Sequence, residues 1–225
     1  MSYVTKYSVI RMRNEVKRNA SLRNQGGLRG NITFKRVIIR RVGPLSWLLA
    51  ENGESMNTND SFYNLAIHEA AHIVIAQLNN IDFEYIEILN EVDGHGATKF
   101  IAPGLRHLNA IHKKNYAFYK NLGEDEVSEL NLLLVNLISV LSAGSIAEFV
   151  FNLKSEPHIE QDDADQLFNI QEFMLTYNIL TRDNFQMFAN NVVHEIEEHK
   201  AKILDLAKNI YSLKGNSRLM KKDLV

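Results

Sequence analysis

The sequence predicts a mainly helical α+β fold, with long helices around a small β element. Only 3 prolines and 11 glycines occur in 225 residues, which favours long helices over a loop-rich β protein. Strand-like alternation of apolar and polar residues is confined to short segments, whereas longer apolar patterns fill much of the chain. With 45% hydrophobic residues, the chain can form one domain with a full core, or a domain with an appendage.

The first 43 residues differ from the rest in charge. Residues 1–43 contain eleven Lys or Arg and one acid, Glu15, for a net charge of +10, while residues 44–225 carry a net charge of −12. We therefore expect a basic N-terminal arm, with a strand over 32–42, followed by a separate domain over 44–225. The arm is a solvated tail, a tail that folds back on the acidic domain, or a binding segment for an acidic partner such as nucleic acid or anionic lipid.

The chain has no cysteine, so neither a disulfide framework nor a thiolate metal site is available. Any metal must be bound by histidine and carboxylate. Residues 1–22 are basic and polar and do not resemble a signal peptide. The apolar run over 132–151 is long enough to span a membrane, but polar residues recur along it, which favours a buried core helix. These features predict a soluble, cytoplasmic protein.

The first half of the domain is expected to form one helix and a β-hairpin. N-cap candidates over 57–61 precede an apolar helix over 61–78, and Asn79-Asn80 can end it. Alternating apolar residues predict a strand over 83–89, and Asp93-Gly94-His95-Gly96 is typical of a turn. A second short strand is expected over 97–101.

The second half is expected to be helical. Glu124-Asp125-Glu126 places acid in the first turn of a helix that continues to about Phe151. Further helices are predicted over 162–177 and 182–213, the latter with a charged face typical of solvent exposure. Small residues over 143–147 indicate close packing of the 124–151 helix against a neighbour, which would let it approach the helix over 61–78.

One motif within the 61–78 helix carries chemistry. His68-Glu69-Ala70-Ala71-His72 has the pattern H-E-x-x-H, which places both histidines on one helix face. Two such imidazoles can bind zinc, and Glu69 can then act as general base. The alternative is a pair of surface or core histidines. We favour zinc, because the helix is apolar and buried histidines need polar partners.

A catalytic zinc ion usually has three protein ligands and one open position. Candidate third ligands are Asp163, which we favour, then Asp162 and Glu148. Glu148 could instead fix a ligand histidine through its free ring nitrogen. The pair Asp162-Asp163 could also simply cap a helix, a role that does not exclude metal binding.

From about residue 59 onward, the chain resembles the peptidase domain of the FtsH family, the membrane-anchored AAA zinc proteases. His68 to His72 is similar to the family's HEAGH, with alanine replacing glycine. The other similar segments occur in family order: 93–103 with the GALGYT-like strand, 143–151 with GGRAAEELVF, 162–167 with ND-L-x-x-A, and 194–224 with the terminal helix.

The resemblance implies a zinc metallopeptidase with ligands His68, His72 and Asp163 and with Glu69 as general base. It also implies that the strand containing Ala97, Thr98, Lys99 and Phe100 binds an extended peptide by edge addition. Two departures are clear, because Ser145 and Phe149 replace the family's arginine and second glutamate.

The chain also lacks a G-x-x-x-x-G-K-[ST] phosphate loop, so no ATP site of that type is expected. We therefore expect a stand-alone, ATP-independent peptidase, either a monomer or a homo-oligomer, that acts on flexible or unfolded polypeptides. The alternatives are a non-proteolytic zinc-binding module that recruits a partner through the arm, and a peptidase served by an ATPase in trans.

Overall fold

The computed structural model describes residues 60–90, 95–154 and 161–224. The expected basic arm over 1–43, its strand over 32–42 and part of the turn over 93–96 lie outside the described residues.

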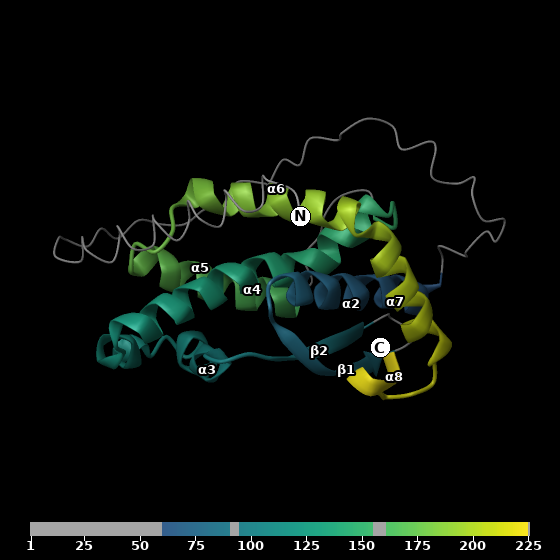
Figure 1. Ribbon diagram of the computed structural model, residues 1–225, viewed down its shortest axis with the longest axis horizontal. Coiled ribbons are helices and arrows are strands. Elements are labelled where there is room, and N and C mark those ends of the chain that lie inside the picture. The colour runs from purple at the N-terminus through teal and green to yellow at the C-terminus, as the bar shows by residue number, and fades with distance from the viewer. Residues whose placement is uncertain (1–59, 91–94, 155–160, 225) are drawn as a thin grey trace.

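The described chain confirms a mainly helical α+β fold with a small antiparallel sheet. Figure 1 shows the sheet on one side of the molecule, α2 and α4 above it, and α6 on the opposite side. Two short 3-10 segments, Leu105–His107 and Tyr116–Asn121, flank α3. The elements in chain order are α2 (Ser61–Leu78), β1 (Asp82–Asn90), β2 (His95–Ile101), α3 (Leu108–His112), α4 (Glu124–Val150), α5 (Gln161–Thr176), α6 (Arg182–Glu198), α7 (Lys200–Ser212), β3 (Arg218–Met220) and α8 (Lys221–Leu224).

The sheet has the strand order β2-β1-β3, with both pairings antiparallel. β1 is therefore central and β2 forms one edge. Partners Ile86 and Thr98 lie opposite each other in the β1–β2 ladder. The two predicted strands are confirmed within one or two residues, but β3 was not predicted. Its three residues are too few for alternation to be recognised in the sequence.

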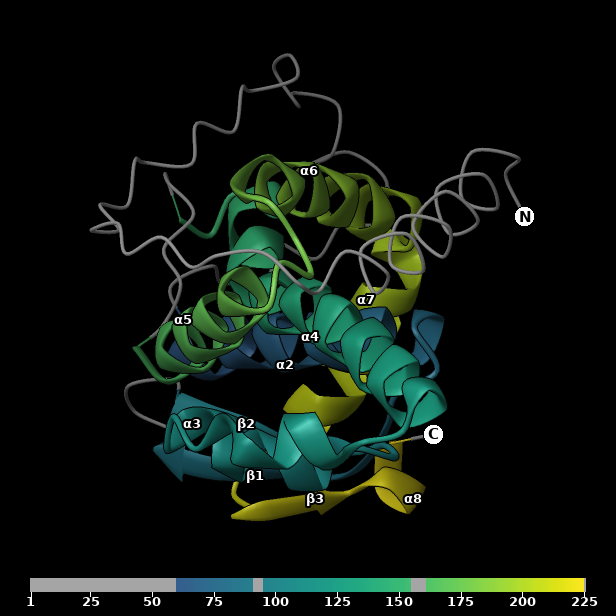
Figure 2. The same cartoon turned by 90° about the vertical axis from the view of Figure 1, so that its left-hand side faces the viewer.

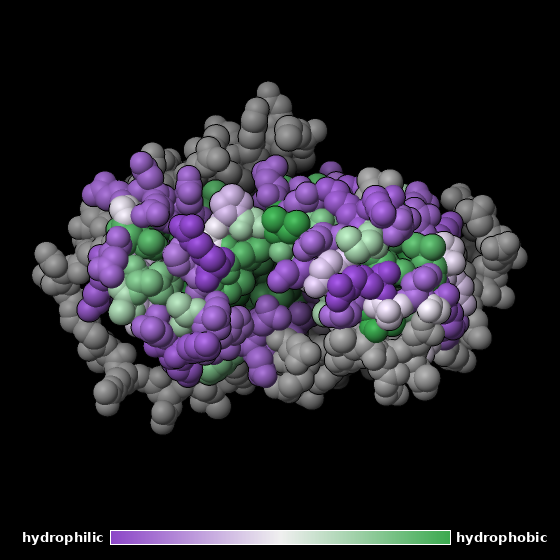
Figure 3. Space-filling view, turned by 90° about the horizontal axis from the view of Figure 1, so that it is seen from below, coloured by the Kyte–Doolittle hydropathy of each residue, from purple (hydrophilic) through white to green (hydrophobic). Residues whose placement is uncertain are grey.

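Helix α4 is the core helix of the domain, and Figure 2 shows it between α2 and α6. Among the described residues it is the one helix long and apolar enough to cross a membrane, yet 89% of its most apolar window is buried inside the protein. The prediction of a core helix is therefore confirmed. On the face shown in Figure 3, apolar side chains form patches separated by polar ones, not one continuous band.

The prediction of one helix over 182–213 is wrong in one respect. The chain turns at His199, and this turn separates two helices, α6 and α7. His199 leaves helical geometry at φ −105° and ψ 18°, and its Nδ1 lies 3.0 Å from the Glu195 carbonyl oxygen. The turn lets α6 pack on α4 and α7 pack on α2. A single straight helix could not cover both surfaces, so tertiary packing overrides the helical pattern in the sequence.

Helix α2 is fixed at its N-terminus by Asp60. The Asp60 carboxylate accepts the Phe62 N–H at 2.9 Å, as an N-cap, and the Tyr211 hydroxyl of α7 at 2.7 Å. Lys214 lies 3.3 Å from the same carboxylate. The Tyr211 hydrogen bond, with the Phe62 and Lys214 contacts, holds the pKa of Asp60 below its ordinary value of 3.8, although burial acts to raise it.

Replacing Asp60 with alanine should lower the free energy of unfolding by about 1 kcal/mol at pH 7, the usual effect of losing an N-cap. A carboxylate with a lowered pKa stabilises the fold above its unfolded pKa and loses that contribution as pH falls through the folded value. The gap between wild type and Asp60→Ala in chemical denaturation should therefore narrow from pH 7 to pH 3.5. The free energy of unfolding of Asp60→Asn, which keeps an acceptor oxygen, should lie between those of wild type and Asp60→Ala. A gap that does not change with pH would refute this role for the charge.

Candidate metal centre

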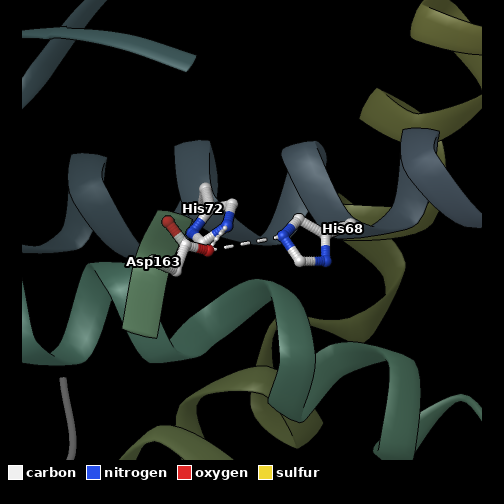
Figure 4. A group of neighbouring side chains, drawn as sticks. All are labelled: His68, His72 and Asp163. Carbon is white, nitrogen blue, oxygen red and sulfur yellow. Dashed lines mark ion pairs between the residues drawn. The ribbon is translucent and has the colours of Figure 1, made fainter. Parts of the chain in front are cut away.

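Three side chains from two helices meet beside the core. His68 and His72 project from one face of α2, and Asp163 approaches them from the first turn of α5 (Figure 4). Asp163 Oδ2 lies 3.2 Å from His72 Nε2 and 3.6 Å from His68 Nε2. The structure thus brings together the two histidines of the motif and the favoured third residue.

The geometry of this group fits a metal ion. One ligand atom from each of the three residues lies within 4.8 Å of the others. Zinc–ligand bonds of about 2.0–2.2 Å in a tetrahedron separate neighbouring ligand atoms by about 3.3–3.6 Å, and the two Asp163 distances of 3.2 and 3.6 Å lie close to that range. These three residues could therefore hold a metal ion.

The second nitrogen of each imidazole has a polar neighbour on α4. His72 Nδ1 lies 2.6 Å from the carbonyl oxygen of Val140 on α4, and His68 Nδ1 lies 3.3 Å from Glu148 Oε1. A proton on His72 Nδ1 would complete a hydrogen bond to Val140, whereas His68 Nδ1 only faces the Glu148 carboxylate and has no hydrogen-bond geometry to it. In both rings this leaves Nε2 as the nitrogen available to a metal. Both Nε2 atoms face Asp163, an arrangement that suits ligand histidines and that also gives each buried imidazole a polar partner.

Glu148 lies at the Nδ1 side of the His68 ring, whereas Asp163 lies at the Nε2 side. This position fits a residue that orients His68 better than it fits a third ligand. At the end of α4, Asn152 adopts a left-handed φ of 60°, and the Leu153 and Lys154 N–H groups donate to the Glu148 carbonyl. This cap returns Lys154 to the helix, where its Nζ lies 2.6 Å from Glu148 Oε2. The side chain of Asp162 lies outside the described residues.

Electrostatics in this cluster favour protonated imidazoles when no metal is bound. Burial would lower the pKa of His68, but the carboxylates of Asp163 and Glu148 raise it to about 10. Burial would also lower the pKa of His72, but the negative charge of Asp163 and its hydrogen bond raise it. Burial would raise the pKa of Asp163, but the two histidines hold it far below its usual range. A divalent cation would replace these protons, so its binding should release protons.

Glu69 lies next to this group, on the side facing the sheet. Its side chain is buried, and the hydroxyl of Thr98 on β2 donates to its Oε2 at 2.5 Å. A pocket of about 340 Å³ joins Glu69 to the three candidate ligands. The pocket is lined also by Gly96, Ala97, Thr98, Phe100, Leu141, Asp165 and Gln166.

The four residues expected to bind substrate divide into two sets. Ala97, Thr98 and Phe100 line the pocket, whereas the Lys99 side chain is exposed and does not line it. All four belong to β2, the edge strand of the sheet. The strand itself is therefore placed for backbone pairing with an extended chain, with the Lys99 side chain exposed outside the pocket.

Gly144 of α4 touches the site more closely than the sequence indicated. A Cβ added at Gly144 would overlap the ring atoms of His68. The small-residue stretch over 143–147 was expected to allow close helix approach, and Gly144 is the position at which α4 and the His68 ring need it. Two further contacts, from Thr98 and from the Val140 carbonyl, had no recognisable sequence signal.

Gly144→Ala should displace the His68 ring or separate α2 from α4. We expect a loss of about 1–3 kcal/mol in the free energy of unfolding, as for other overpacked cores, and a fall in zinc affinity of about 10-fold or more. A chelator-competition titration measures the affinity. Gly123→Ala is a matched control, since its Cβ would meet only the Glu126 carboxylate, at 3.8 Å. Equal zinc affinity in the two variants would show that the His68 ring does not depend on Gly144.

Comparisons of the chain with protein-family models, with curated proteins and with solved structures give no match. The function of this protein is therefore inferred from the geometry of the site and from the motifs in the sequence.

Proposed function

We propose that this chain is a stand-alone zinc metallopeptidase that hydrolyses peptide bonds in flexible or unfolded polypeptides. The observation that carries the proposal is the convergence of His68, His72 and Asp163 on a pocket that also contains the Glu69 carboxylate. Within the described residues, one wall of that pocket is formed by β2, an edge strand of the sheet. A metal group, a proton acceptor and a peptide-binding edge are the three parts that such an enzyme needs.

Zinc is the metal we propose for these donors, because the two histidines belong to an H-E-x-x-H helix. Two imidazoles and one carboxylate, with a fourth position facing a pocket, are typical of catalytic zinc. Magnesium and calcium prefer all-oxygen ligand sets, and soft metals prefer thiolates, which this chain lacks because it has no cysteine.

The residues of the pocket divide the chemistry between them. Bound zinc would polarise a peptide carbonyl and lower the pKa of a water molecule. Glu69 would accept a proton from the attacking water and deliver it to the leaving nitrogen. β2 would hold the substrate in extended form along its open edge, with alternate side chains directed into the pocket. Val140 and Glu148 would keep the two imidazoles in position.

The resemblance to the FtsH peptidase domain supports the same proposal. The similar segments follow the family's order, and the structure brings the counterparts of its ligands and base together in one pocket. The chain contains no phosphate loop, so the proposed activity does not need ATP bound to this chain. A cytoplasmic location suits a cysteine-free chain whose most apolar helix is buried.

The test is cleavage of casein, a flexible substrate, by the full chain. The zinc-loaded protein should cleave it without ATP, a chelator such as 1,10-phenanthroline should abolish cleavage, and added zinc should restore it. Cleavage that persists in a protein shown to be metal-free would refute the proposal, as would a zinc-loaded protein that cleaves neither casein nor a peptide library.

The charge asymmetry favours one second candidate, a non-proteolytic zinc module that recruits an acidic partner through residues 1–43. Deleting these residues separates the two functions. A peptidase should keep its casein activity, whereas a recruiting module should lose a salt-sensitive interaction with nucleic acid or anionic vesicles.

A further inference from the structure

We propose that Thr98 is a positioning residue for the general base, so that the strand proposed to receive the substrate also sets the orientation of the group that moves the proton. The inference rests on the proposed function and deepens it. It concerns Glu69 and β2, not the ligands of the metal.

The contact between them is short and spans two elements. Thr98 Oγ1 donates to Glu69 Oε2 at 2.5 Å, across 29 residues of sequence. A hydroxyl bound to a carboxylate is among the stronger hydrogen bonds in proteins. Because Glu69 is buried, the loss of a donor there cannot be made good easily by bulk water.

The second carboxylate oxygen faces the same strand. A Cβ built on Gly96 would lie 3.2 Å from Glu69 Oε1 and 3.0 Å from Leu65 Cδ1. Gly96 and Thr98 are two residues apart on β2 and therefore point to the same face of the sheet. β2 thus holds Oε2 through the Thr98 hydrogen bond, whereas Oε1 packs close to Gly96 in room that a side chain there would take.

On this proposal Oε2 is the anchored atom, which leaves Oε1, the oxygen that does not carry the Thr98 hydrogen bond, to take up and return the proton. A peptide that pairs with the open edge of β2 would order the strand, and so would fix the Thr98 hydroxyl and the carboxylate together. The strand then links substrate binding to catalytic orientation, which precise general-base catalysis requires.

The test compares Thr98→Val, which has the same shape but no donor, with Thr98→Ser, which keeps the donor. Thr98→Val should lower kcat about 10-fold or more with KM and zinc affinity within about twofold of wild type, and Thr98→Ser should recover most of the rate. Thr176→Val is the matched control, because the Thr176 hydroxyl bonds a helix carbonyl at the far end of α5.

A second readout does not depend on activity. In the zinc-free protein, Thr98→Val should lower the melting temperature by about 2–4 °C, and this shift should shrink strongly in a Glu69→Ala background, as expected for two groups that interact directly. Equal shifts in both backgrounds would overturn the inference.

The kinetic outcomes separate the inference from the proposed function. If the wild type cleaves peptide and Thr98→Val is equally active, only the positioning role is overturned. A Thr98→Val variant that loses zinc as much as rate, or a Thr98→Ser variant as slow as Thr98→Val, also overturns it. A zinc-loaded wild type that cleaves no peptide overturns both.

Discussion

Glu69→Gln should lower kcat for peptide cleavage by roughly 10²–10⁴-fold, the range that general-base catalysis contributes, while the protein still binds zinc. Glutamine keeps the size of the side chain and can still accept the Thr98 hydrogen bond through its amide oxygen. It cannot accept a proton at neutral pH. The effect should therefore fall on the chemical step and not on metal binding, because Glu69 is not among the three grouped ligand atoms.

Initial rates on a quenched fluorescent peptide, together with zinc content by atomic absorption, measure both properties in one preparation. Glu129→Gln is the control, since it makes the same change at an exposed position on α4. A Glu69→Gln variant as active as wild type would exclude Glu69 as the base. Loss of zinc in that variant would instead point to a role for Glu69 as a metal ligand.

Asp163→Asn should weaken zinc binding by about 100-fold or more. Changes to groups that only orient a ligand usually cost about 10–100-fold, and Asp163 supplies a ligand atom itself. Asparagine has nearly the same shape but no negative charge, so the charge contribution is isolated from packing. Chelator competition at pH 7 measures the affinity, and Asp205→Asn on the exposed side of α7 is the control.

A direct comparison with Glu148→Gln identifies the third ligand. We expect Glu148→Gln to lose less affinity than Asp163→Asn, because Glu148 lies at the Nδ1 side of His68 and not at Nε2. The reverse order, with Glu148→Gln the weaker binder, would assign the third ligand to Glu148.

Much of the site could be predicted because its chemistry is local in sequence. The spacing of His68 and His72 places both on one helical face whatever the tertiary structure, and the acids around Asp163 occupy the start of a helix. Helix α2 has the expected bounds of Ser61–Leu78, since its cap and its stop are both encoded by neighbouring residues.

The parts that could not be predicted depend on contacts between distant segments. No pattern in the sequence marks the Thr98 hydroxyl as a partner of Glu69. The two meet only because β2 pairs with β1 and packs against α2. The turn at His199 is likewise set by the two surfaces that α6 and α7 cover, not by a breaker residue. For α4, the apolar composition alone fits both a core helix and a membrane span, and burial by its neighbours distinguishes them.

The measurement that tests the central claim most directly is a crystal structure of the zinc-soaked protein, with anomalous data collected on both sides of the zinc absorption edge. We expect one strong anomalous peak per chain about 2.0–2.2 Å from His68 Nε2, His72 Nε2 and an Asp163 carboxylate oxygen, with a fourth position open to the pocket. A peak at another site, or a zinc ion closed off by a fourth protein ligand, would contradict a catalytic zinc centre in this protein.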